Sequence, residues 1–234
     1  MYKTLKNTVT VFFISIFVIT LVLSSPVYAE VESTTTTKIQ APIIPQYPEL
    51  PRGCEVTSLA MLLQHAGVQV DKMTLAEAVK KDPTPYQRKN GKVYFGNPNR
   101  GFVGDMYTKT NPGLGVYHKP IADLANQFLA GRIIDLTGST FEEIETYLVN
   151  GSPVWVIANA RYRELPNSVF QKWHTQDGVI SITYHEHSVL VTGYDDKYVY
   201  FNDPLTGIKN KKAPKADFIK SWVQMGKQAI TYLE

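Results

Sequence analysis

The chain has 234 residues, of which 44% are hydrophobic, 12% aromatic and 19% charged. This composition is typical of a globular protein with a hydrophobic core and excludes an intrinsically disordered chain. The formal net charge is +3. Without Lys3 and Lys6, 22 basic residues face 21 acidic ones, so the rest is nearly neutral. The sequence shows no basic stripe and no basic run beyond residues 209–212, so we expect no nucleic-acid partner. The length fits one domain, or at most two.

Residues 1–29 have the three parts of a secretory signal peptide. Lys3 and Lys6 form a positive region, residues 9–23 are an apolar core, and residues 27–29 (VYA) offer a cleavage site. The apolar core is short for a membrane span, although an uncleaved anchor is the alternative. We therefore expect a secreted, extracellular protein that can associate with the cell wall. After signal cleavage we expect no stable membrane insertion.

Two further segments complete the expected domain organisation. Residues 30–40 are mostly polar and are expected to form a flexible leader. Residues 41–234 are expected to form a single folded domain.

The single cysteine, Cys54, stands where an irregular segment gives way to a helix. Pro48, Pro51 and Gly53 oppose a helix before it, and apolar residues recur at helical spacing after it, up to a stop at Gly67. Free N–H groups and the helix dipole in a first turn favour a thiolate and can stabilise an oxyanion. A lone cysteine in an exported chain cannot form an intramolecular disulfide. We therefore interpret Cys54 as a nucleophile rather than as a small core residue.

The remaining elements follow from hydrophobic periodicity, capping boxes and turn residues. Residues 82–115 and 161–178 are expected to be irregular loops. Helices come first in the chain and a mostly antiparallel sheet follows, which indicates an α+β fold. In chain order, the expected helices cover residues 74–81, 120–129, 140–150 and 215–225, and the expected strands cover residues 154–158, 187–194, 198–202 and 228–233.

The two strands on either side of residues 195–197 are expected to form a β-hairpin. Because side chains alternate along a strand, His187 shares a face with Val189 and Val191. A three-residue turn pairs residue 189 with Asp203 and places His187 diagonally across from that carboxyl group, within reach of a hydrogen bond. A two-residue turn would favour Asn202 instead. The apolar pattern of the second strand favours Asp203.

Cysteine, histidine and aspartate in one site have the chemistry of a catalytic triad. The thiolate of Cys54 would attack a carbonyl carbon. His187 would hold the thiol proton and later protonate the leaving amine, while Asp203 would orient the imidazole. Gln46, eight residues before the cysteine, is the candidate donor for the oxyanion hole.

Several segments resemble the C39-like peptidase family, a bacterial branch of the papain-like cysteine proteases. The resemblance covers about residues 41–233. It is carried by residues 45–55 (PQYPELPRGCE), 187–195 (HSVLVTGYD) and 200–204 (YFNDP), and by the loops 101–104 (GFVG) and 115–118 (GVYH).

The resemblance implies a papain-like cysteine protease fold with N-terminal helices packed on a mostly antiparallel sheet. It also implies that Cys54 is the nucleophile, His187 the general base and acid, Asp203 the orienting acid and Gln46 the oxyanion donor. The best-known C39 domains are fused to export transporters and trim leader peptides inside the cell. This sequence has no ATPase motif and carries an export signal, so that substrate is not transferred to it.

We therefore expect an exported cysteine peptidase or amide hydrolase that acts on a peptide. Two alternatives remain open, a hydrolase of cell-wall peptides and a catalytically inactive papain-like binding module. No cofactor or metal is expected. His185, Glu186 and His187 could bind zinc, but such a site would occupy His187 and leave the placement of Cys54 unexplained.

Overall fold

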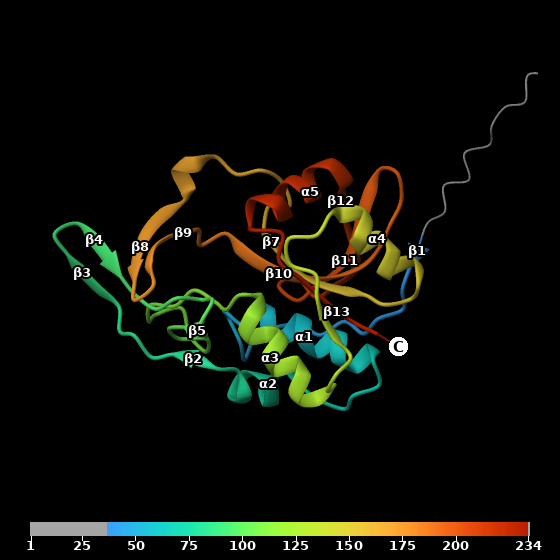
Figure 1. The fold of residues 1–234 in the computed structure, drawn as a ribbon, viewed down its shortest axis with the longest axis horizontal. Coiled ribbons are helices and arrows are strands. Elements are labelled where there is room, and N and C mark those ends of the chain that lie inside the picture. The colour runs from blue at the N-terminus through green and yellow to red at the C-terminus, as the bar shows by residue number, and fades with distance from the viewer. Residues whose placement is uncertain (1–36, 234) are drawn as a thin grey trace, which may run out of the picture. The chain divides into compact units, whose positions relative to one another are not determined.

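The computed structural model describes residues 37–233, so the expected signal peptide and most of the expected leader lie outside the described part of the chain. The central element is an antiparallel sheet of strand order β12-β11-β10-β7-β13-β6 (Figure 1). Its strands are β6 (Ile133–Asp135), β7 (Val154–Asn159), β10 (Glu186–Tyr194), β11 (Tyr198–Asp203), β12 (Ile208–Pro214) and β13 (Ala229–Tyr232).

Strand β1 (Thr37–Lys38) adds to this sheet at the end of β10. The pairing of β7 with β10 stops at Val191, which leaves the backbone of Gly193 and Tyr194 open to β1 on that side. Residues 37 and 38, which the sequence assigned to a flexible leader, therefore form a strand of the main sheet.

Helices cover both faces of the sheet (Figure 1). On one side lie α1 (Cys54–His65), α2 (Lys72–Ala78) and α3 (His118–Phe128), and on the other lie α4 (Phe141–Val149) and α5 (Lys215–Gln224). Each face has its own hydrophobic core. Leu190 of β10 belongs to the core with α1, and its neighbour Val189 belongs to the core with α5. This alternation fixes which side of the sheet each residue of β10 faces.

The segments expected to be irregular contain short strands. One small sheet has the order β3-β4-β8-β9, and β2 pairs with β5. Val93 lies opposite Trp173, and local sequence patterns cannot reveal a pairing between residues so far apart in the chain. The strands are β2 (Lys81–Asp82), β3 (Gln87–Lys89), β4 (Lys92–Tyr94), β5 (Phe102–Val103), β8 (Gln171–Thr175) and β9 (Gly178–Ile182), and a 3₁₀ turn η1 covers Asn167–Val169.

The first residues of three helices can be compared with the capping and helix-breaking residues that predicted them. Helix α1 begins at Cys54, as the proline and glycine pattern predicts. Helix α4 has both hydrogen bonds of the predicted capping box at Thr140. Helix α2 starts earlier than predicted, because Asp71 rather than Thr74 caps it and accepts from the Thr74 N–H group. It also ends earlier, at Ala78, and Lys81 belongs to strand β2 instead. No helix within residues 37–233 combines the length and the hydropathy of a membrane span.

The β10–β11 hairpin reaches the expected register by a different route. The turn is one residue longer than predicted, because Tyr194 pairs with Val199. A β-bulge between Val191 and Gly193 then takes up the extra residue. Beyond the bulge Leu190 lies opposite Asn202, which is the register that a three-residue turn would give.

Candidate active site

His187 and Asp203 are hydrogen-bonded in the core of the hairpin. Nε2 of His187 lies 2.8 Å from Oδ1 of Asp203, and the two side chains are 3% and 0% exposed. A carboxylate only accepts, so the hydrogen is on Nε2 and Nδ1 remains to receive another proton. This hydrogen bond joins His187 and Asp203, the two residues that the alternation of side chains along the hairpin strands predicted to lie on one face.

Asp203 is surrounded by donors. Its oxygens also accept from the Tyr162 hydroxyl at 2.9 Å, the Thr206 hydroxyl at 2.9 Å, the Lys211 ammonium at 2.7 Å and the Leu205 N–H group at 2.9 Å. Burial by itself would raise the pKa of Asp203. The hydrogen bonds from His187, Lys211 and Thr206 and the charge interaction with His187 outweigh burial and hold this pKa well below its usual range. The group is therefore a carboxylate throughout the physiological pH range.

Cys54 and His187 line the same pocket, which has a volume of about 270 Å³. Cys54 is the first residue of α1, where a backbone N–H has no acceptor within the helix. The Cys54 residue is buried, with 6% of its surface exposed. The walls of the pocket are formed by Gln46, Pro51, Arg52, Cys54, Lys109, Gly113, Leu114, Ala160, Tyr184, Glu186, His187 and Leu205.

The Cys54 thiol donates its hydrogen bond to Glu55, with Sγ 3.3 Å from Oε2. Burial raises the pKa of the Cys54 thiol well above its usual value, and the nearby carboxyl groups of Glu55 and Glu186 raise it further. The helix start alone favours a thiolate, but these effects outweigh it. In this arrangement Cys54 is a neutral thiol.

Glu55 and Glu186 have unusual protonation states themselves. Burial raises the pKa of Glu55 to about 7, although N–H donors, including that of Val116 at 2.7 Å, partly oppose it. Burial and the charge of Glu55 raise the pKa of Glu186 well above its usual value.

Gln46 lies beside Cys54 but uses its amide group on the backbone. Its Nε2 lies 3.2 Å from the carbonyl oxygen of Leu50 and 3.0 Å from that of Pro51, while its buried Oε1 has no partner within residues 37–233. An oxyanion could therefore receive a hydrogen from Gln46 only by replacing one of these carbonyls. The Leu50 contact is the longer and weaker of the two.

Within residues 37–233, the three residues considered as an alternative zinc site, His185, Glu186 and His187, do not form a cluster of ligand atoms. Within residues 37–233, the one group of three potential ligands whose donor atoms lie within 4.8 Å of one another is Cys54, Glu55 and Glu186. A metal ion would require all three groups to lose their protons. Their burial opposes this loss, and His187 is already bonded to Asp203.

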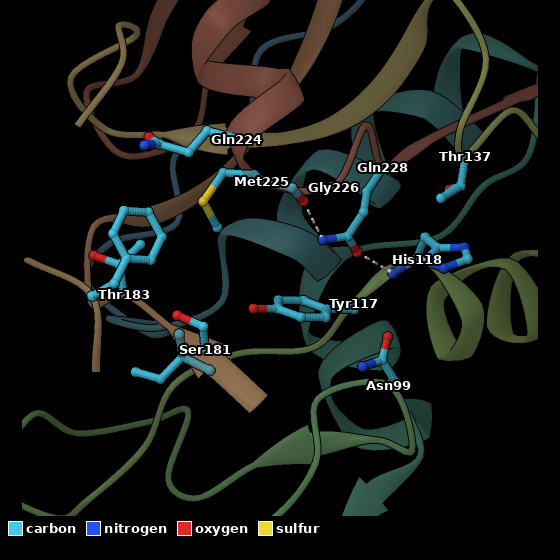
Figure 2. Close-up of a pocket in the computed structure, with 12 residues that line it drawn as sticks. Asn99, Tyr117, His118, Thr137, Ser181, Thr183, Gln224, Met225, Gly226 and Gln228 are labelled. Carbon is cyan, nitrogen blue, oxygen red and sulfur yellow. Dashed lines mark hydrogen bonds between the residues drawn. The ribbon is translucent and has the colours of Figure 1, made fainter. Parts of the chain in front are cut away.

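A second pocket of about 300 Å³, shown in Figure 2, has neither Cys54 nor His187 among the residues that line it. The Tyr117 ring extends across it, and Gln228 accepts from the His118 N–H group and donates to the Met225 carbonyl group. The His118 ring pairs with Asp135, with Nδ1 2.6 Å from Oδ2. This pocket has polar walls but lacks the cysteine thiol, so we place the candidate chemistry in the first pocket.

Comparison with known proteins identifies the family. The model of the Peptidase_C39-like family matches residues 38–230. The chain belongs to this family. It is 50% identical over 183 residues to the uncharacterized protein YvpB of Bacillus subtilis (strain 168), and this match covers 78% of the chain and 70% of YvpB.

A solved structure gives the same result for the fold. The crystal structure of a candidate C39-like peptidase from Bacillus anthracis matches with a TM-score of 0.79 and 46% identity. The match covers 85% of this chain and 98% of that chain. The resemblance and the α+β, papain-like fold expected from the sequence are therefore confirmed.

Three side chains that face the candidate triad were not anticipated. Tyr162 reaches Asp203 from a loop, and Glu55 and Glu186 flank Cys54. The sequence did offer one signal, since a glutamate directly follows the cysteine in the first turn of a mostly buried helix. The role of Tyr162 had no local signal.

Proposed function

We propose that this member of the C39-like family is an exported cysteine peptidase or amide hydrolase. One observation carries the proposal. Cys54, the first residue of α1, lines the same pocket as His187, and His187 is hydrogen-bonded to Asp203. Family membership supports peptidase chemistry. Export is supported by the signal-like pattern of residues 1–29.

The proposed mechanism assigns one task to each group. His187 takes the thiol proton on Nδ1, because Nε2 is bonded to Asp203. The thiolate of Cys54 attacks the scissile carbonyl carbon, and the Cys54 N–H group and Gln46 stabilise the oxyanion. The imidazolium then protonates the leaving amine, and water releases the acyl group from sulfur. Asp203 keeps the imidazole oriented and stabilises its charge.

The substrate we propose is a peptide, either free or part of the cell wall. The pocket beside Cys54 has Leu114, Leu205 and Tyr184 on its walls, and Tyr184 is 57% exposed. Apolar and aromatic side chains of this kind suit a peptide side chain.

A catalytically inactive binding module is the second candidate, because the thiol is bonded to Glu55 and is neutral. The rate of Cys54 alkylation as a function of pH separates the two. Since Cys54 is the single cysteine, the signal comes from it alone. A triad predicts thiolate reactivity well below the ordinary pKa of ~8.5, together with its loss in His187→Ala.

Turnover is the direct test. Cys54→Ala should abolish hydrolysis of peptides or wall fragments and keep the folded circular-dichroism spectrum. Hydrolysis that survives this substitution would refute the mechanism. For export, N-terminal sequencing of protein from the culture medium should find a chain that starts near Glu30, whereas an intact N-terminus in the membrane fraction would indicate an anchor.

A further inference from the structure

Two carboxyl groups from distant parts of the chain meet beside the candidate nucleophile. Glu55 belongs to α1 and Glu186 to β10, and their oxygens and the Cys54 sulfur lie within 4.8 Å of one another. Gly115 leaves the space that they need. A Cβ atom at this position would overlap Oε1 of Glu55 and lie 3.0 Å from Oε2 of Glu186. The backbone of residues 115 and 116 therefore accommodates the pair, and Val116 donates its N–H to Glu55.

Within residues 37–233 neither carboxyl group forms an ion pair, although the cationic side chains of Arg52 and Lys109 and the His187 imidazole line the pocket that Glu186 also lines. Cys54 from α1 and Tyr117 from the segment before α3 face the two carboxyl groups, and both are uncharged acids. Burial and the charges of Glu186 and Glu55 raise the pKa of Tyr117, which also lines the second pocket (Figure 2).

A buried carboxyl group and a partly buried one this close, with no ion-pair partner, do not readily both ionise near neutral pH. At least one proton therefore stays on the pair. Oε1 of Glu186 is buried and has no hydrogen-bond partner within residues 37–233, which fits a protonated acid better than a carboxylate. A protonated Glu55 can accept from the thiol, as it does here, and can also donate to a thiolate.

We propose that Glu55 and Glu186 are positioning residues for Cys54: the protonated pair holds the thiol and, after its proton has passed to His187, donates a hydrogen bond to the thiolate. This inference rests on the proposed function. In the step, the S–H bond breaks, the electron pair stays on sulfur and the proton goes to Nδ1 of His187. The Glu55 hydroxyl group changes from acceptor to donor, and no co-reactant is required.

The proposal has an unusual consequence for pH dependence. When Glu55 loses its proton, its negative charge opposes the thiolate beside it. The thiolate paired with His187 should therefore become less abundant as the pH rises through about 7, the pKa of Glu55. An isolated thiol does the opposite, since its reactivity increases steadily with pH.

The test measures the second-order rate constant of Cys54 alkylation by iodoacetamide from about pH 5.5 to about pH 9. The wild type should show a fall in rate above about pH 7. In Glu55→Gln, the neutral amide should remove the fall and raise the rate at pH 8 by about tenfold, the factor that one pKa unit represents. Glu164→Gln is the matched control, because Glu164 is exposed and outside the pocket. Its profile should coincide with that of the wild type.

Glu186→Gln is the second variant, because either carboxyl group of a coupled pair can be the one that titrates. If both glutamine variants keep the wild-type profile, the proposal is overturned. It is also overturned if Glu55→Gln is folded, by circular dichroism, but has lost reactivity at every pH, because a charged Glu55 would then be required.

The double variant His187→Ala/Glu55→Gln separates this proposal from the triad itself. If His187→Ala leaves the wild-type reactivity unchanged, the proposed function fails. Independently of that result, Glu55→Gln should lower the pKa of the Cys54 thiol in the His187→Ala background. An unchanged thiol pKa there overturns the positioning role and leaves the triad intact.

Discussion

The imidazole of His187 donates from Nε2 to a carboxylate, that of Asp203, which also accepts from Tyr162, Thr206 and Lys211. These donors come from the loop after β7, the Asp-Pro turn and β12. The orientation of the candidate base is therefore fixed by three separate parts of the fold. Each contact can be tested by a single substitution.

Asp203→Asn should reduce kcat and leave KM nearly unchanged. The amide can keep the shape of the site but stabilises neither the correct imidazole tautomer nor the imidazolium, so we expect a loss of roughly 10²-fold or more. Asp195→Asn is the matched control, because Asp195 lies in the turn of the same hairpin and bonds the Tyr200 hydroxyl group. Steady-state kinetics on a cleaved peptide are the measurement. A change confined to KM would indicate that Asp203 contacts substrate instead.

Asp203 should also contribute to acid stability. Its pKa in the folded protein lies below its value of ~4 in the unfolded chain, so the unfolded state binds the proton more readily. The stabilisation is complete above the unfolded pKa and is lost as the pH falls towards the folded pKa. Urea unfolding should show a constant difference between wild type and Asp203→Asn above about pH 5, and a smaller one below about pH 4. A difference that is the same at both pH values would contradict this linkage.

Tyr162→Phe removes one donor to Asp203 and keeps the ring. A hydrogen bond to a buried charge is worth roughly 1.5–3 kcal/mol, and the loss should appear in the free energy of unfolding. Tyr200→Phe is the control on β11, because its hydroxyl group bonds the Asp195 carboxylate near the surface. We expect a smaller cost there, about 1 kcal/mol or less. Equal costs for the two variants would argue against a special role of Tyr162.

Gly115→Ala should displace the Glu55 carboxyl group, because the new methyl group would overlap Oε1. Overpacking of this kind costs about 1–3 kcal/mol. In a double variant with Glu55→Ala the overlap is absent, so the two costs should not add. Urea unfolding of the two single variants and the double variant gives this coupling. Strict additivity would mean that Gly115 does not accommodate Glu55.

Local patterns predicted much of the site. The proline and glycine pattern before Cys54 predicted that it lies in the first turn of a helix, because those residues oppose a helix, and Cys54 is the first residue of α1. Strand alternation placed His187 on the face of Val189. The hairpin turn was predicted one residue too short, and a bulge, which has no clear local signal here, restored the register.

The charge state of the nucleophile could not be predicted in the same way. The sequence indicates that a helix dipole acts on Cys54, but it does not indicate how deeply the thiol is buried or that Glu186 approaches it. That approach depends on the packing of α1 against β10, which brings together residues 131 positions apart. Removal of an ionisable group from water disfavours its charged form, and the size of the resulting pKa shift depends on tertiary packing.

The sequence by itself determined the order of the helices and of strands β7, β10, β11 and β13, and the positions of Cys54, His187 and Asp203 along the chain relative to them, because propensity and periodicity act over a few residues. The likeness of its motifs to the C39-like peptidases indicated the family. The tertiary structure decided that Tyr162 reaches Asp203 and that the carboxyl groups of Glu55 and Glu186 lie beside the thiol. These contacts join segments distant in the chain, and their energies depend on burial and distance, which exist only once the chain has folded.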